Sequence, residues 1–230
     1  MKKVLLNKGY RFPYWGPFVL ETTIEDEFVK ILLEKGREAT IDARLDLAGQ
    51  IEKEFYYEKY EDWFISRFSP YVDLYLENVV PYKGNSFQYL LERNYSTMQE
   101  PWNSFQEINI KNITWFLHAL WINFQAANEY NPPHDHTGDL SFIIYLQVPK
   151  EIGEEKSIQS SGGTVAPGAL CMEFGIEMPF SIAGYSKVPE VGDILIFPAW
   201  LKHHVIAFKS DVERISVSGN MSLGLRNDKV

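Results

Sequence analysis

The first half of the chain carries apolar residues at helical spacing. Polar start signals followed by apolar residues three or four positions apart predict amphipathic helices. We expect helices over residues 22–36, 42–57 and 60–80, a strand and turn over residues 1–20, and either a short helix or an irregular connection over residues 86–98. Gly36 is the expected end of the first helix, and Pro70 is expected to kink or break the third. We interpret the aromatic side chains of this half as packing residues.

The pattern changes near Ile108. From there, β-branched and aromatic residues come in short runs separated by Gly and Pro turns, which is typical of strands. The runs cover residues 113–125, 140–148, 169–174, 180–183, 193–197, 203–208 and 214–220. Such a series predicts a sandwich or barrel. Because no linker separates the halves, we expect a single domain over residues 1–230, with about residues 1–107 as helical support on one outer face of a strand-rich core of about residues 108–222.

Composition excludes several classes of protein. A hydrophobic content of 45% in 230 residues is typical of a globular chain. The net charge of −9 argues against general nucleic-acid binding, which needs a basic face. The single cysteine, Cys171, excludes an intrachain disulfide and suits a reducing compartment. The sequence shows neither a signal peptide nor a membrane span, so we expect a cytoplasmic protein with no membrane partner and leave its oligomeric state open, with a homodimer among the options.

Four of the five histidines lie in two short stretches, which makes them candidate metal ligands. His134 and His136 flank Asp135, and side chains two positions apart on a strand point the same way. We therefore expect both imidazoles to face one point, with Asp135 facing away. His203 and His204 are neighbours, so only one of them can point inward. Two histidines plus an oxygen ligand, with open coordination positions, are the pattern of a non-haem Fe(II) site, so we expect a metal site built from both stretches.

The last expected strand carries a candidate anion site. Arg214, Ser216, Ser218 and Asn220 share one face, opposite Ile215 and Val217. A guanidinium with a hydroxyl two residues further on is well suited to hold a carboxylate. Taken singly, each of these features is more often structural than functional, and it is their combination that indicates a site. We interpret the fifth histidine, His118, as a packed core residue on the opposite parity from Asn123.

With these motifs the sequence resembles the 2-oxoglutarate/Fe(II)-dependent oxygenases over about residues 113–222. The resemblance rests on His134-x-His136 in place of the family's His-x-Asp/Glu, the turn and strand Gly192–Pro198, a distal histidine, and Arg214-x-Ser216 eleven residues beyond it. Within the family the chain is most similar to small oxygenases of unassigned role with a Phe-Pro-x-Trp-Leu-x-His motif, here residues 197–203. That alignment selects His203 over His204.

The resemblance implies a fold and a chemistry. The fold is a double-stranded β-helix, or jelly roll, with the N-terminal helices on the larger sheet. Fe(II) binds through His134, His136 and His203, and 2-oxoglutarate is the co-substrate, with Arg214, Ser216, Tyr145 and Asn123 as its candidate binding residues. With O₂ as the oxidant, 2-oxoglutarate is converted to succinate and CO₂ while a C–H bond of a small-molecule or protein substrate is oxidised, most simply by hydroxylation. The sequence does not give that substrate.

One departure from the family leaves alternatives open. His136 stands where the family has an acidic ligand, and Asp139, just after Gly138, is its rival for the third metal position. The leading hypothesis is an oxygenase. A second is a cupin-like metal enzyme with three histidines that does not use 2-oxoglutarate. A third is a jelly roll that binds a ligand or partner without catalysis.

Overall fold

The computed structural model describes residues 16–79, 111, 113–156, 158–160 and 163–225. These residues form a larger sheet of β1 (Leu20–Thr23), β2 (Ile41–Asp42), β3 (Glu54–Tyr56), β4 (Ile113–Gln125), β6 (Leu140–Gln147), β11 (Asp193–Pro198) and β13 (Arg214–Leu225). The smaller sheet contains β5 (Asn131–His134), β9 (Leu170–Glu173), β10 (Gly184–Lys187) and β12 (Lys202–Val205). A separate hairpin pairs β7 (Ile158–Ser160) with β8 (Gly163–Val165). The helices are α1 (Asp26–Glu38), the π-helical turn η1 (Glu61–Ile65), α2 (Ser66–Val79) and α4 (Lys150–Glu154).

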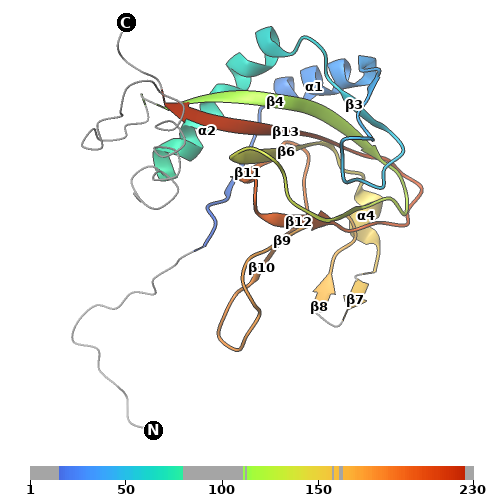
Figure 1. Cartoon of the computed structure of the whole chain (residues 1–230). Helices are drawn as coiled ribbons and strands as arrows, with labels where there is room; N and C mark the ends of the chain where they lie inside the picture. Colours follow the sequence, from blue (N-terminus) through green and yellow to red (C-terminus); the bar gives the residue numbers. More distant parts are fainter. Residues whose placement is uncertain (1–15, 80–110, 112, 157, 161–162, 226–230) are drawn as a thin grey trace, which may run out of the picture.

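The two sheets have the topology of a jelly roll. Their strand orders are β1-β11-β6-β13-β4-β3-β2 and β10-β9-β12-β5. From β4 onward the chain crosses repeatedly between them, so most strands that are neighbours in a sheet, such as β4 and β13 or β6 and β13, are far apart in the sequence. Figure 1 shows α1 and α2 on one side of the larger sheet and the smaller sheet on the other. This confirms the expected double-stranded β-helix with helices packed on its larger sheet.

An aromatic cluster joins the helical layer to the larger sheet. Phe64 of η1 stacks on Phe68 of α2 with ring centroids 4.8 Å apart, and Phe68 lies 4.3 Å from Phe142 of β6. Leu32 of α1 is fully buried in the same core. Burying one such side chain contributes roughly 1.5–3 kcal/mol, so this contact fixes the helices on the sheet. Along the described ranges, no helix is long and apolar enough to cross a membrane.

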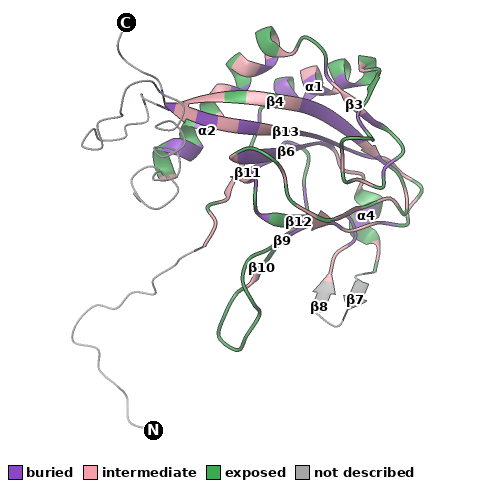
Figure 2. Ribbon diagram, viewed as in Figure 1, coloured by how far each residue is buried: buried purple, intermediate pink, exposed green. Residues whose placement is uncertain are grey.

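The central strands β6 and β11 of the larger sheet are buried on both faces. In β6 and β11, Ile144 and Ile196 point into the core beneath the helices. Tyr145 and Leu195, one position away, point into a second core shared with Leu170 of β9. This alternation explains why the strands read as continuous apolar runs. Figure 2 shows β6 and β11 buried, while the loop between β9 and β10 is exposed.

Most of the expected elements are confirmed. The runs beginning at residues 113, 140, 169, 193, 203 and 214 correspond to β4, β6, β9, β11, β12 and β13. The last strand continues to Leu225. The first helix begins later than the start signal at Thr22 and runs past Gly36 to Glu38, and α2 continues through Pro70 without a break. The expectations for residues 1–15 and 86–98 lie outside the described residues, and the single-domain organisation stays a prediction.

The expected helix over residues 42–57 is wrong. In its place Ile41 pairs with Tyr56 between β2 and β3, and β3 pairs with β4. The Asp42 side chain accepts a hydrogen bond from the backbone N–H of Arg44 and so stabilises the intervening turn. Long-range pairing with β4 overrides the helical spacing of the local sequence, because strand preference depends on the available partners.

Two further expectations are also corrected. Residues 180–183 form a turn and an irregular segment before β10, with Phe180 exposed at a φ of 68°. A run of apolar residues there predicts a strand only if a partner lies beside it. His118 is exposed on β4 and makes a 2.7 Å hydrogen bond to the hydroxyl of Ser222. The interpretation of His118 as a core residue is therefore wrong. The register of β4 with β13 skips His118 between Leu117 and Ala119, so it lies at a bulge where simple alternation does not hold.

Candidate metal centre

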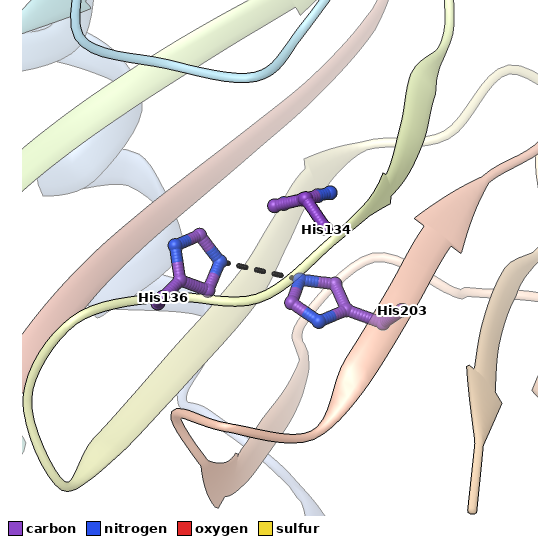
Figure 3. Close-up of side chains that lie close together, drawn as sticks. All are labelled: His134, His136 and His203. Atoms are coloured by element: carbon purple, nitrogen blue, oxygen red, sulfur yellow. Dashed lines mark hydrogen bonds between the residues drawn. The ribbon is translucent and has the colours of Figure 1, made fainter.

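Three of the expected ligands come together at the open end of the two sheets. His134 lies at the end of β5 and is paired in register with His203 of β12. One ring nitrogen from each of His134, His136 and His203 lies within 4.8 Å of the others. The Nε2 atoms of His136 and His203 are 3.2 Å apart, and Figure 3 shows the three rings converging. Two cis ligands at about 2.1 Å from a common ion lie about 3 Å apart, so the cluster fits a metal ion.

The backbone around the cluster explains why His136 joins it. β5 is the edge strand of the smaller sheet, which is where two consecutive prolines can be accommodated. Beyond the strand, the N–H of His136 donates to the carbonyl of Ala199 over 2.8 Å. Gly138 then turns at a φ of 98°, and an added Cβ there would lie only 2.6 Å from the Met221 carbonyl oxygen. The chain is therefore held in place on both sides of His136.

Backbone carbonyls set the tautomers of two of the imidazoles. His134 Nδ1 lies 2.7 Å from the Pro132 carbonyl, and His203 Nδ1 lies 2.8 Å from the Leu201 carbonyl. Because a carbonyl oxygen only accepts, each Nδ1 carries the proton and donates it. Each Nε2 then carries a lone pair rather than a proton, and that of His203 faces Nε2 of His136 within the cluster. Such orientation of a ligand by an outer partner is typical of metal-binding histidines.

The protonation state of the cluster also suits a cation. Burial lowers the pKa of His136 to about 3, with the neighbouring His203 and His134 adding to the effect. Burial likewise lowers the pKa of His203 to about 4 and lowers that of His134. The three imidazoles are therefore neutral near pH 7, as metal coordination requires.

The rival candidates lie elsewhere. The Oδ2 atom of Asp139 accepts a hydrogen bond from the backbone N–H of Leu223 at 2.7 Å, and Asp139 is not part of the cluster. Asp135 is exposed, as its parity predicts. His204 points away from His203 and lies 3.8 Å from the carboxylate of Glu173. Sequence parity placed His134 and His136 together and allowed only one of the two later histidines to join them, and the family resemblance selected His203. These are the histidines that the structure brings together, while their role as metal ligands stays a proposal.

The expected anion-binding residues line the same cavity as the histidines, or border it. Arg214, Ser216 and Asn123 are part of its wall, with Ser218 beside them, and Tyr145 is paired with Ser216 in the adjacent strand. The guanidinium of Arg214 is 5.4 Å from the Tyr145 ring, and its Nη1 donates to the Gly168 carbonyl at 2.5 Å. Within the described ranges no carboxylate lies within 4 Å of it, and its Nε has no hydrogen-bond partner.

Asn220 is the exception among the residues assigned to this face. Its side-chain oxygen accepts a 2.6 Å hydrogen bond from the Ser141 hydroxyl, and it does not line the cavity. The register with β4 shifts here, because Asn220 is paired with Ala119 and Met221 with Leu117, which makes His118 of β4 the extra residue. The alternation of β13 itself continues, since Met221 and Leu223 pack in the same core as Ile215 and Val217, so Asn220 keeps the polar face but lies beyond the cavity.

Sequence reasoning missed a further part of the cavity wall. Glu54 of β3, Gly49 of the loop before it, Trp121 of β4 and Asn131 of β5 all line it. Burial, with a contribution from nearby Glu129, raises the pKa of Glu54 to about 7. The sequence signal for Glu54 was a single acidic residue before the apolar run Phe55–Tyr57. We did not consider it as a site residue because we interpreted this segment as a helix.

Comparison with known proteins gives the family of this core. Residues 119–220 match the family model described as "Putative 2OG-Fe(II) oxygenase". No curated protein matches the chain in sequence. Among solved structures, the chain is similar to a viral collagen prolyl hydroxylase from Paramecium Bursaria Chlorella virus-1, with 12% identity over 91% of this chain and 98% of that one and a TM-score of 0.51.

Two further structures are similar at the same low identity. The nogalamycin-biosynthesis epimerase SnoN, described as non-heme and alpha ketoglutarate dependent, has 12% identity, coverage of 92% of this chain and 82% of that one, and a TM-score of 0.50. An oxidoreductase of the 2OG-Fe(II) oxygenase family from Burkholderia pseudomallei has 14% identity and a TM-score of 0.35, and the match spans only 47% of this chain and 44% of that one. At these identities the likeness concerns the fold. The core of the chain, residues 119–220, thus matches the model of the 2-oxoglutarate/Fe(II)-dependent oxygenases, and the similar solved structures share its fold.

Proposed function

We propose that the chain is a hydroxylase that uses Fe(II) and 2-oxoglutarate, with His134, His136 and His203 as the metal ligands. In this proposal Arg214 and Ser216 hold the far carboxylate of 2-oxoglutarate. The observation that carries it is Arg214, a buried guanidinium without an anionic partner in the described chain, in the same cavity as three converging imidazoles.

The energetics of Arg214 support an anionic ligand. Removing an ion from water costs several kcal/mol, and a buried charge is normally paired. Arg214 retains one hydrogen bond to a neutral carbonyl, and burial lowers its pKa from the ordinary value. A carboxylate at its free edge would restore that value and satisfy Nε. The hydroxyl of Ser216, two residues along the same face, is placed as a further donor to the same group.

The residues of the chain have defined roles in this chemistry. Pro132 and Leu201 hold two imidazoles through their carbonyls, so the metal site exists before the metal binds. The apolar side chains of Ile143, Leu170 and Phe197 line the cavity and exclude water from it. Bound Fe(II) with 2-oxoglutarate would supply the oxidation of a C–H bond coupled to decarboxylation.

His136 in place of an acidic ligand changes the charge of the centre. Three neutral imidazoles leave Fe(II) with both positive charges until the co-substrate arrives, whereas a carboxylate ligand would cancel one of them. We therefore propose that iron and 2-oxoglutarate bind cooperatively, because the dianionic co-substrate supplies the missing negative charge. The engagement of Asp139 with Leu223 supports His136 as the third ligand.

The experiment is an anaerobic titration with Fe(II) and 2-oxoglutarate, followed by measurement of succinate after oxygen is admitted. We expect one iron per chain, 2-oxoglutarate binding that depends on iron, and slow succinate formation even without the prime substrate. Iron binding without 2-oxoglutarate binding would point to the cupin-like alternative. Failure to bind either would favour a jelly roll that binds a ligand without catalysis.

The cellular setting belongs to the same proposal. The single Cys171 and the net charge of −9 support a cytoplasmic protein that does not bind nucleic acids in general. Hydroxylation is also the reaction named for the viral collagen prolyl hydroxylase that shares the fold. That likeness supports the reaction type and leaves the substrate open.

A further inference from the structure

A row of polar side chains crosses the larger sheet beneath the cavity. In the strand registers Tyr145 of β6 is paired with Ser216 of β13, Ser216 with Asn123 of β4, and Asn123 with Glu54 of β3. Residues opposite one another in neighbouring strands project from the same face. The row therefore runs from the neighbourhood of Arg214 to Glu54, and Ser216 belongs to the co-substrate site proposed above. Glu54 does not.

Glu54 is buried and unpaired. Its exposed fraction is 1%, and its Oε2 atom has no hydrogen-bond partner in the described chain. Among the described residues no lysine or arginine nitrogen lies within 4 Å of its carboxylate. The loop before β3 passes close to the Glu54 side chain, because a Cβ added to Gly49 would lie only 2.6 Å from Oε1. A carboxylate in such a position destabilises the chain unless a ligand supplies donors.

The groups around Glu54 are acceptors as well. The side-chain oxygens of Asn131 and Asn123 are buried in the same cavity without partners. Asn131 lies beside Glu54 across Gly49, since the same added Cβ would be 3.0 Å from its Oδ1. Three unsatisfied acceptors, one of them a carboxylate, complement a group that carries several N–H donors and a positive charge.

Resting on the function proposed above, we propose that Glu54, with Asn131 and Asn123, determines substrate specificity by binding a protonated amine of the prime substrate. The site is thus divided between an anionic co-substrate near Arg214 and a cationic substrate group at Glu54. The amine can belong to a free small molecule or to a lysine side chain, since both present the same ammonium group.

The charged groups around Glu54 make this binding visible as a proton change. Burial and the carboxylates of Glu129 and Asp42 raise the pKa of Glu54, Arg44 opposes them, and the result is about 7. Near pH 7 the carboxyl is therefore about half protonated, and a bound cation would drive the proton off. Binding of one ammonium group should release about half a proton at pH 7.

The test uses enzyme loaded anaerobically with Fe(II) and 2-oxoglutarate, with n-butylammonium and Nα-acetyl-lysine methylamide as probes and n-butanol as the uncharged match. Calorimetry in two buffers of different ionisation heat gives affinity and proton release together. We expect both cations to bind at least tenfold more tightly than n-butanol, with proton release. A preference for the lysine derivative would indicate a protein substrate, and equal binding a small amine.

Glu54→Gln should weaken the binding of both cations at least tenfold relative to the wild type and abolish the proton release. Its affinity for 2-oxoglutarate should stay within about twofold of the wild-type value. Glu52→Gln removes the same charge from an exposed position two residues away and should change neither quantity. Equal binding of n-butanol and n-butylammonium, or unchanged cation binding in Glu54→Gln, would overturn this inference. Since 2-oxoglutarate binding is measured on the same samples, its loss in the wild type would instead contradict the proposed function.

Discussion

The two ends of the polar row differ in chemistry although both are buried in one cavity. At one end Arg214, with Ser216 and Tyr145 next to it, offers donors and a positive charge. At the other end Glu54, with Asn131 and Asn123, offers acceptors and a carboxyl group. Neither charge is neutralised by a salt bridge within the described chain. The molecule therefore keeps two opposite charges apart, and each is left for a different ligand.

The two ends also differ in how firmly the fold holds them. Arg214 begins a strand of twelve residues that is paired on both sides, with β4 and with β6. Glu54 begins a strand of three residues whose outer neighbour, β2, has only two. Short strands near a sheet edge open more readily than long central ones. The co-substrate end is thus rigid, and the end assigned to the prime substrate is the one able to adapt.

The largest expected effect concerns the metal, on which both ends depend. His136→Ala should abolish iron binding, because its Nε2 is one of three converging nitrogens. Asp139→Ala should retain iron, since its carboxylate is occupied by the N–H of Leu223. Iron per chain is measured after anaerobic loading and desalting. His204→Ala, which removes an imidazole outside the cluster, is the control and should retain iron. If Asp139→Ala lost iron while His136→Ala kept it, Asp139 and not His136 would be the third ligand.

The next largest effect concerns 2-oxoglutarate binding at the Arg214 end of the polar row, called here the donor end, and should leave metal binding unchanged. Arg214→Ala should weaken 2-oxoglutarate binding by at least about 100-fold, because it removes a bidentate charged contact. Iron binding should not change. Arg214→Lys should also bind weakly, because one ammonium cannot reproduce the planar fork. Equilibrium dialysis of labelled 2-oxoglutarate against iron-loaded protein measures this. Unchanged affinity in Arg214→Ala would remove Arg214 from the co-substrate site.

A smaller effect should appear at the Glu54 end of the polar row, called here the acceptor end, as a dependence of the free energy of unfolding on pH. The pKa of Glu54 is about 7 in the fold and near 4.5 in an unfolded chain, so the folded state holds more protons between these values. Wild-type stability should therefore fall as pH rises from about 4.5 to about 7 and stay low above that. Glu54→Gln should remove this loss, up to about 3 kcal/mol at pH 8, and match the wild type at pH 4.

Urea unfolding of ligand-free protein at the two pH values measures this difference. Glu52→Gln, at the exposed position, should follow the wild type at both. An equal effect of Glu54→Gln at pH 4 and pH 8 would show that the carboxyl does not titrate with a raised pKa.

The smallest effect should come from the loop over Glu54. In Gly49→Ala the new methyl group would sit 2.6 Å from Glu54 Oε1, so the flexible carboxylate must move. We expect a stability loss of about 1 kcal/mol and a few-fold weaker binding of n-butylammonium. 2-Oxoglutarate affinity should not change, because the donor end is untouched. Gly153→Ala, where an added Cβ meets nothing within 4 Å, is the matched control, and equal behaviour of the two variants would contradict the close contact.

Features that depend on local alternation were determined by the sequence. On an extended strand two-residue periodicity is unavoidable, and it was enough to place Arg214 and Ser216 on one face and Ile215 on the other. The same parity separated His203 from His204. The strands from residue 113 onward were likewise predictable, because Gly and Pro turns delimit runs of β-branched and aromatic residues.

Features that depend on a distant partner were decided only by the tertiary structure. Residues 54–56 become a strand because β4 offers them an edge, which nothing within residues 42–57 announces. Glu54 enters the cavity for that reason alone, and its raised pKa follows from burial by segments far away in sequence. The exposure of His118 has the same origin, since it lies where the register of β4 shifts against the distant strand β13. Local pattern fixes which way a side chain points along its strand, whereas packing decides what it meets there.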